Sequence, residues 1–348
     1  MKKSIIIGTA LLLMAAACEK GQHGNYEGAA EETGDAVPVT IRFTKSSSAH
    51  TLSADPEEKI NSIKLVLYSL KGEERTFESY YEFGQEEIDN LSGTIYIDES
   101  KDVEKYLISM YANMEEIGAS SYTEDWALFS NEGTGDFQMY GEVLDTKDNI
   151  LQKKSIEIDL VRHCSKVSVN EIAVEWKNEA NRYKKFRLKG LYLMDAMGMI
   201  CNLYGYTGQS PVAWYNMNGY EPGPQDALLY NEIDDIEIDE STAYDVSHTL
   251  YGYISDKTVY NSSETWAEGG TRLVIEAEFN EQPCYYAIAV NRNGLSDIRN
   301  THFVFDKIKI TRPGADKPYT AMPEEESVSV SFHVKEWHTE NHGEIIID

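Results

Sequence analysis

Cysteine, proline and basic residues are all scarce in this 348-residue chain. It has 4 Cys, 9 Pro and 31 Lys plus Arg against 59 Asp plus Glu, for a formal net charge of −28. Nucleic-acid binding needs Lys and Arg to displace counterions from phosphate, so this balance argues against a nucleic-acid partner. It argues equally against an electrostatic hold on anionic lipid. An acidic surface instead keeps a protein soluble and discourages random association.

The cysteines form no metal-binding pattern. Beyond Cys18, the chain holds Cys164, Cys201 and Cys284 at wide spacing, with no Cys-x-x-Cys pair. Structural zinc sites need closely spaced ligand pairs, so no metal site is expected here. We interpret these three residues as small apolar side chains of the core. One disulfide among them stays open as an alternative in an oxidising compartment.

Sequence motifs of catalysis are also missing. There is no Gly-x-Ser-x-Gly elbow, no His-Glu-x-x-His and no Gly-rich phosphate loop. His333, His338 and His342 cluster near the end, but an extended strand would place the first two on opposite faces. Residues 233–239 alternate Ile with acids, which fits a solvated strand face better than a calcium loop. The sequence therefore predicts no enzyme, no cofactor and no metal.

Tyrosine is the outstanding residue type, at 23 positions. Aromatic residues favour strands, and surface Tyr suits adhesive contacts. The Trp residues could form a platform for sugar rings, although such residues belong more often to a core or an interface. The four concerned are Trp176, Trp214, Trp266 and Trp337.

The first 17 residues have the pattern of a cleavable signal peptide. Lys2 and Lys3 precede an uncharged apolar run that is too short to span a membrane comfortably. The run ends in Ala-Ala-Ala-Cys, which resembles a bacterial lipobox. That resemblance implies cleavage before Cys18, acylation of its thiol with diacylglycerol and palmitate, and attachment to outer-membrane lipid. Residues 18–36 are polar and predict a flexible tether.

From residue 37 onward the sequence predicts an all-β protein. Residues 39–43 alternate apolar and polar side chains, which is the period of a half-buried strand. Many short strands separated by Gly, Pro, Asn and Asp turns are typical of β-sandwiches. We expect a domain over residues 37–162 and a second over 163–348. Further strands are expected at residues 60–70, 93–98, 105–113, 155–160, 165–176, 187–194, 272–279, 285–290, 302–311 and 327–334.

An ordered series of motifs resembles the fimbrillins, the type V pilin subunits of Bacteroidales. The lipobox and the first strand come first, followed by a strand at residues 106–113 that ends in Ala-Asn. Residues 158–167 (Ile-Asp-Leu-Val-Arg-His-Cys-Ser-Lys-Val) resemble the start of the family's second domain. Residues 302–314 and 329–337 resemble its last two strands. Each motif is weak alone, and their order over the whole mature chain carries the resemblance.

The resemblance implies two transthyretin-like β-sandwich domains in tandem and a cell-surface fimbrium assembled by strand exchange. Proteolysis removes the first strand, and a neighbouring subunit's C-terminal strand fills the groove, head to tail. The implied partners are other fimbrial subunits and a host or bacterial surface ligand for adhesion. The implied donor strand carries Val328, Val330, Phe332, Val334 and Trp337.

One departure from the family concerns the processing site. Stalk subunits carry an Arg in the loop after the first strand, whereas residues 44–58 here contain no Arg. Arg42 and Lys45 are the candidate cleavage sites, unless a different protease acts. A third hypothesis is that the strand is retained, in a lipid-bound anchor or tip subunit. A non-polymerising surface lipoprotein that binds glycan or protein is the alternative function.

Overall fold

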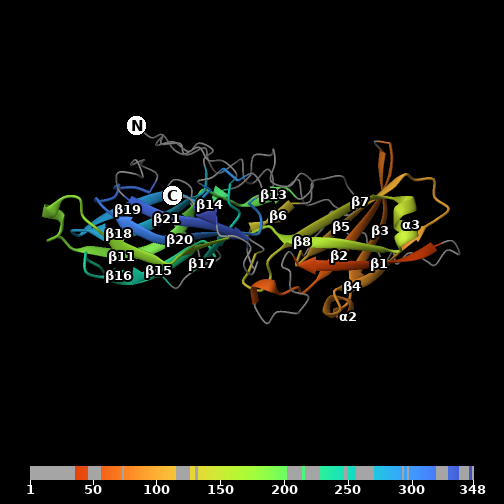
Figure 1. Ribbon diagram of the computed structural model, residues 1–348, viewed down its shortest axis with the longest axis horizontal. Coiled ribbons are helices and arrows are strands. Elements are labelled where there is room, and N and C mark those ends of the chain that lie inside the picture. The colour runs from red at the N-terminus through yellow and green to blue at the C-terminus, as the bar shows by residue number, and fades with distance from the viewer. Residues whose placement is uncertain are drawn as a thin grey trace, which may run out of the picture.

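The computed structural model is built almost entirely of β-strands, as the all-β prediction requires. It describes residues 36–45, 56–72, 74–114, 126–129, 132–201, 214–215, 228–246, 249–255, 270–291, 294–295, 298–318, 328–336 and 345–346. Figure 1 shows an elongated molecule with two groups of strands at opposite ends of its long axis. Within the described ranges, no helix is both long and apolar enough to cross a membrane.

The first group of strands is a sandwich of a four-stranded and a three-stranded layer. The strand order is β3-β2-β5-β7 followed by β8-β1-β4. The two layers join at one corner, where β7 and β8 share the pairs Met139–Arg162 and Tyr140–Val161. The strands are β1 (Ala36–Lys45), β2 (Ile63–Lys71), β3 (Glu74–Phe83), β4 (Ser92–Asp98), β5 (Lys105–Ala112), β7 (Met139–Thr146) and β8 (Ser155–Arg162).

Two short helices and a 3-10 turn connect these strands. They are η1 (Pro56–Glu58), α2 (Gln85–Asp89) and α3 (Lys147–Lys153). Thr146 caps α3 by accepting a hydrogen bond from the Asn149 N–H, and Lys154 ends the helix at a φ of 52°. Helices of five and seven residues are too short for a helical period to show in the sequence.

The second group of strands is also a sandwich. In one layer the long strand β20 (Thr301–Ile310) pairs with β21 (Val328–Glu336) on one side. On its other side it pairs in parallel with β9 (Ser165–Val169) and β10 (Glu171–Val174) in succession. The opposite layer has the order β15-β11-β18-β19. The remaining elements are η3 (Glu179–Asn181), β11 (Phe186–Met194), β12 (Ala196–Met197), β13 (Met199–Cys201), β14 (Trp214–Tyr215), β15 (Tyr230–Glu237), β16 (Ala243–Asp245), β17 (Thr249–Gly252), β18 (Arg272–Phe279), β19 (Gln282–Ala289) and β22 (Ile345–Ile346).

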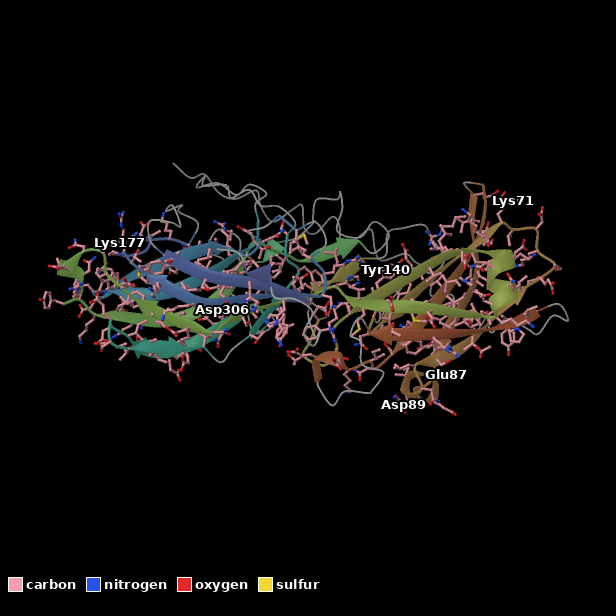
Figure 2. The ribbon with its side chains drawn as sticks, viewed as in Figure 1. Lys71, Glu87, Asp89, Tyr140, Lys177 and Asp306 are labelled. Atoms are coloured by element: carbon pink, nitrogen blue, oxygen red, sulfur yellow. The ribbon has the colours of Figure 1, made fainter. Side chains whose placement is uncertain are left out.

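The two sandwiches meet in a packed junction. The short strand β6 (Trp126–Leu128) comes from the first half of the chain and pairs with β13 from the second. Phe129 packs edge-on against Tyr253, and Phe137 lies with its ring centroid 5.0 Å from that of Tyr251. One apolar cluster thus runs from the first sandwich into the second without a gap. Figure 2 places Tyr140 near this junction, with Lys71 and Lys177 toward opposite ends of the molecule.

Candidate functional site

Strand β1 is the middle strand of its three-stranded layer. It pairs antiparallel with β4 from Ala36–Asp98 to Arg42–Ser92. It pairs in parallel with β8 from Thr40–Ser155 to Lys45–Leu160. The three strands lie side by side in the sandwich at the right of Figure 1. Because both edges are paired, removal of β1 would leave two rows of unpaired backbone groups facing each other.

The apolar side chains of β1 point into the first core. Val39 and Ile41 are fully buried, and Phe43 is 1 % exposed. The Phe43 ring stacks on Phe83, with centroids 6.3 Å apart and planes 8° apart. Phe83 also covers Gly93, where a Cβ atom would lie 2.7 Å from its ring. Burial of each of these β1 side chains contributes about 1.5–3 kcal/mol, so the strand is a major part of this core.

The backbone of β1 alternates between its two neighbours. The Thr40 N–H donates to the Lys154 carbonyl on the β8 side, at 3.0 Å. The Phe43 N–H donates to the Leu91 carbonyl on the β4 side, at 3.1 Å. Even positions therefore face β8 and odd positions face β4. Pro38 is an even position that precedes the first β8 pair, so its missing N–H costs no ladder bond.

The two candidate cleavage residues lie in different settings. Arg42 is exposed, but its backbone lies between Ser92 of β4 and Glu157 of β8. Lys45 is the last residue of β1 and pairs on one side only, with Leu160. A protease that binds an extended substrate needs several free residues, which residue 42 does not offer while β1 is paired. The intervening residues 46–55 lie outside the described part of the chain.

The expected donor residues lie in the sandwich at the other end of the chain. Val328 and Phe332 are 5 % and 8 % exposed, and Val330 is half-buried. The Phe332 ring packs on Phe305, at 4.9 Å between centroids, and stacks on Phe303. All of β21 pairs with β20, and this includes the backbone of Val334. Trp337 lies outside the described residues.

Among the described residues, the other edge of β21 is paired at two positions only. Strand β22 pairs with it at two positions, His333–Ile346 and Val334–Ile345. Two pairs hold far less backbone than the nine pairs between β20 and β21. Strand β22 is therefore attached to the sheet through less backbone than β21 itself.

Hydrogen bonds and an ion pair connect the two sandwiches at their junction. The buried Arg162 guanidinium donates to the Glu57 carbonyl at 3.0 Å and to the Asn300 side chain at 2.9 Å. The Glu57 carboxylate pairs with Lys166 at 2.8 Å and accepts a hydrogen bond from the Tyr251 hydroxyl. Sequence reasoning found none of these contacts, because they join residues more than 100 positions apart.

The carboxyl group of Glu132 lies in the same junction. Burial raises the pKa of Glu132 to about 8, although the residue as a whole is partly exposed. Its carboxyl accepts hydrogen bonds from the Tyr253 hydroxyl at 2.6 Å and the Gln138 N–H at 2.8 Å. Burial lowers the pKa of His163 to about 3 and raises that of the Cys164 thiol well above its usual range.

The other sequence candidates have ordinary structural roles in the described residues. His333 bonds Asp306 at 2.7 Å, whereas His338 and His342 lie outside the described residues. Trp176 lies in the second core between Phe186 and Phe279, so it is no part of a surface platform. No group of three or more His, Cys, Asp or Glu side chains suited to a metal ion occurs among the described residues.

For two of the cysteines, the structure supports the interpretation as small apolar residues of the core. Cys164 and Cys284 are buried and carry free thiols. The Cys201 backbone belongs to β13, and its side chain is outside the described set. Cys18, the candidate lipidation residue, precedes the described residues, as do the signal peptide and the tether apart from its last residue, Ala36, which begins β1. Their assignment stays a prediction.

Comparisons place this architecture among solved structures of bacterial surface proteins. Fimbrilin (FimA) from Porphyromonas gingivalis W83 is 16 % identical, with 89 % of this chain and 99 % of that chain covered and a TM-score of 0.57. A candidate cell adhesion protein from Parabacteroides distasonis ATCC 8503 is 12 % identical, covers the same shares and has a TM-score of 0.57. Another, from Bacteroides eggerthii DSM 20697, is 13 % identical, covers 88 % and 97 %, and has a TM-score of 0.56. No family model and no curated protein matches the sequence.

At these identities the likeness concerns the fold. The chain is an all-β protein of the β-sandwich fold that fimbrilin has, and the similarity extends over nearly the whole length of both chains. The expected resemblance to fimbrillins is thereby confirmed at the level of the fold. It was the order of several weak motifs that carried this prediction.

Proposed function

We propose that this protein is a structural subunit of a cell-surface fimbria that supports adhesion and assembles by strand exchange after proteolysis. The central position of β1 between β4 and β8 carries the proposal. Support also comes from the fold that the chain shares with a fimbrilin and with candidate cell adhesion proteins. A fimbrial subunit binds other subunits and needs no catalytic residue, in keeping with the missing motifs.

The acceptor site in this proposal is the groove that β1 leaves. Its floor loses Val39, Ile41 and Phe43, and its walls are the facing edges of β4 and β8. An extended segment with three alternating apolar side chains would restore both the core and the two ladders. The groove would therefore select for a strand, rather than for a helix or a loop.

The donor in this proposal is the C-terminal tail that begins at Val328. Within it we expect β21 to stay in its own sheet, because its departure would expose Phe332 and open the core around Phe303 and Phe305. In the described part of that tail, β22 is held by two pairs only, so we expect it to leave at lower cost. Strand β21 then acts as the root from which the tail reaches the next subunit.

Such a contact joins unlike surfaces and propagates head to tail. A heterologous contact that does not close into a ring generates a filament. The acceptor layer and β21 belong to different sandwiches, which lie at opposite ends of the long axis in Figure 1. The partners are other fimbrial subunits and, before processing, outer-membrane lipid through Cys18. A surface-exposed outer-membrane location follows from the same proposal.

The test is the N-terminal sequence and intact mass of the protein recovered from the cell surface. We expect a new N-terminus between residues 46 and 60, because Lys45 ends β1 and the exposed Lys59 follows η1. Cleavage after Arg42 is expected only if β1 first leaves the sheet. Filaments on these cells should consist of the shortened chain. Surface protein that keeps the Cys18 terminus throughout would contradict a processed stalk subunit.

A second candidate, an anchor or tip subunit that keeps β1, has its own supporting observation. The Arg of the candidate site lies inside the strand, where both of its edges are paired. In that case the surface protein starts at a lipidated Cys18 and sits at one end of a filament made of other subunits. Electron microscopy with a label on this chain separates the two, since a stalk subunit is labelled along the whole length.

A further inference from the structure

The two layers of the first sandwich are joined differently at their two corners. At one corner β7 and β8 are paired through backbone. At the other corner β3 and β4, the two ends of the strand order, have no ladder between them. There the Tyr81 hydroxyl of β3 makes the hydrogen bonds to β4 that a neighbouring strand would otherwise make. It accepts a hydrogen bond from the Tyr96 N–H at 3.0 Å and donates one to the Tyr96 carbonyl at 3.3 Å.

The orientation of Tyr96 explains why a side chain is needed. Tyr96 lies opposite Pro38 in the ladder with β1, and Pro38 is one of the even positions of β1, whose backbone groups face β8 rather than β4. The N–H and C=O of Tyr96 therefore point away from β1, toward the seam with β3. Its neighbours Ile95 and Ile97 direct their backbone groups toward β1. A single phenol thus satisfies the outer edge of β4 at the centre of the strand.

Loss of β1 changes what holds β4. In the described part of the chain, β1 is the one strand that pairs with β4. Without β1, β4 keeps its buried Ile95 and Ile97, the short connection through α2 and the two bonds to Tyr81. Strand β8 stays tied through its corner with β7. The groove therefore has one wall fixed by backbone and one fixed by a side chain.

We propose that the Tyr81 hydroxyl is a positioning group that holds β4 in register as the second wall of the acceptor groove. This inference rests on the proposed removal of β1. Before removal, the hydroxyl has little to do, because seven pairs to β1 already fix β4. After removal, it keeps the backbone groups of Ile95 and Ile97 aimed at the incoming strand. Preorganisation of this kind reduces the entropy cost of binding.

The test uses the full chain with a specific protease site inserted between residues 45 and 56. After cleavage, the freed strand is stripped in urea and removed by gel filtration. A fluorescent synthetic peptide with the sequence of residues 36–45 then reports on the groove by anisotropy. We expect Tyr81→Phe to bind this peptide roughly ten-fold more weakly than the parent chain, since two hydrogen bonds and their ordering effect are lost.

Tyr80→Phe is the matched control. It removes the corresponding hydroxyl from the neighbouring residue of β3. The Tyr80 side chain packs against the apolar cluster that runs from the first sandwich into the second. We expect its affinity for the peptide to equal that of the parent. Hydrogen exchange gives the second measurement: in the stripped chain with the peptide bound, the amides of residues 95–97 should exchange faster in Tyr81→Phe than in Tyr80→Phe. In the uncleaved chains, only the Tyr96 amide should respond to Tyr81→Phe.

Three results would overturn the inference. Equal affinity of both variants is one, and equal protection of β4 in both stripped chains is another. A stripped parent chain that binds no peptide would show that no groove persists for Tyr81 to hold. None of these measurements depends on filaments or on natural processing. A failure of the proposed function in cells therefore remains distinguishable from a failure of Tyr81 to position β4.

Discussion

Strands β1 and β21 have nearly the same sequence pattern and opposite settings. Residues 39–43 read Val-Thr-Ile-Arg-Phe, and residues 328–332 read Val-Ser-Val-Ser-Phe. In both strands, the first and last of these side chains are buried. The last one, a Phe, packs on another aromatic ring: Phe43 of β1 on Phe83, and Phe332 of β21 on Phe305. Yet β1 is paired along both edges, whereas β21 is paired fully with β20 and at two positions with β22.

The difference shows that an apolar alternation identifies a buried strand without telling whether the strand is exchanged. Whether a buried strand can be exchanged depends on how its two edges are paired. Removal of β1 exposes two ladders at once and creates a place that only another strand can fill. Strand β21 is paired along one edge with β20 and, among the described residues, at only two positions along the other, with β22. The sequence pattern of β21 is therefore compatible both with a donor strand and with a strand of its own sheet. In the structure, β21 is paired in its own sheet, with β20.

The largest expected effect concerns the tail after β21. Deletion of residues 337–348 should abolish assembly of the processed chain, because no segment is then left to enter the next groove. A disulfide between Cys residues at 309 and 329 should leave assembly intact, because it only fixes β21 to β20. Lys309 and Ser329 are opposite each other in the ladder, at a spacing that suits a disulfide.

Size-exclusion chromatography and electron microscopy after proteolytic removal of β1 measure both variants. The Ser329→Cys single variant is the control for the substitution itself. If the oxidised double variant stays monomeric and assembles again on reduction, β21 itself is the donor. In that case Val328, Val330 and Phe332 act as the original donor hypothesis states.

The next effect compares the two aromatic residues. Phe43→Ala should lower the free energy of opening of the first sandwich by about 3–5 kcal/mol, the range for truncation of a buried Phe. Phe332→Ala should cost less in the second sandwich, near the lower end of this range of about 3–5 kcal/mol, because β21 is paired along only one full edge among the described residues and can relax around the cavity. Native-state hydrogen exchange of β1 and β21 amides measures the two separately.

Thr40→Ala and Ser331→Ala are the matched controls for these truncations. They change outward positions of the same two strands and should shift the opening free energies by less than about 0.5 kcal/mol. Equal costs for the two Phe variants would show that β21 is as tightly bound as β1. The contrast between a central strand and an edge strand would then lose its energetic basis.

The sequence predicted the strands whose alternation is regular, such as residues 155–160 of β8 and 272–279 of β18. It gave no signal for β3, because that strand lies at the edge of its layer and most of its side chains are only half-buried. A strand with both faces partly solvated has no need to alternate. The contact between Tyr81 and β4 could not be predicted for the same reason, since Tyr81 belongs to β3.

The junction between the sandwiches was also beyond the reach of the sequence. Glu57, Arg162 and Asn300 come from three distant segments, and no local pattern marks a contact between them. The separation of residues 37–162 from 163–348 remains a prediction about independent domains. The chain passes from β8 to β9 between Arg162 and Ser165, but the apolar cluster crosses that point.

The smallest expected effect tests this junction, through which the sandwich of β1 is coupled to that of β21. Burial raises the pKa of Glu132 to about 8, so the folded protein holds a proton that an unfolded Glu releases near pH 4.5. Stability from this group is full below pH 4.5 and is lost as the pH rises through 8. His163, with its pKa lowered to about 3, acts oppositely and only below about pH 6.5.

The window from pH 6.5 to 8 therefore isolates Glu132. Tyr253, Cys164 and Asp136 are the other titratable groups around it, and the Cys164 thiol stays protonated there because burial and Glu132 raise its pKa. The free energy of unfolding should fall by about 1–2 kcal/mol across this window in the parent, and Glu132→Gln should remove most of that slope. Urea unfolding at four pH values measures it, with Glu142→Gln on β7 as the control that keeps the slope. A slope unchanged by Glu132→Gln would mean that the carboxyl meets solvent, and that the two sandwiches are less tightly joined than their shared apolar cluster implies.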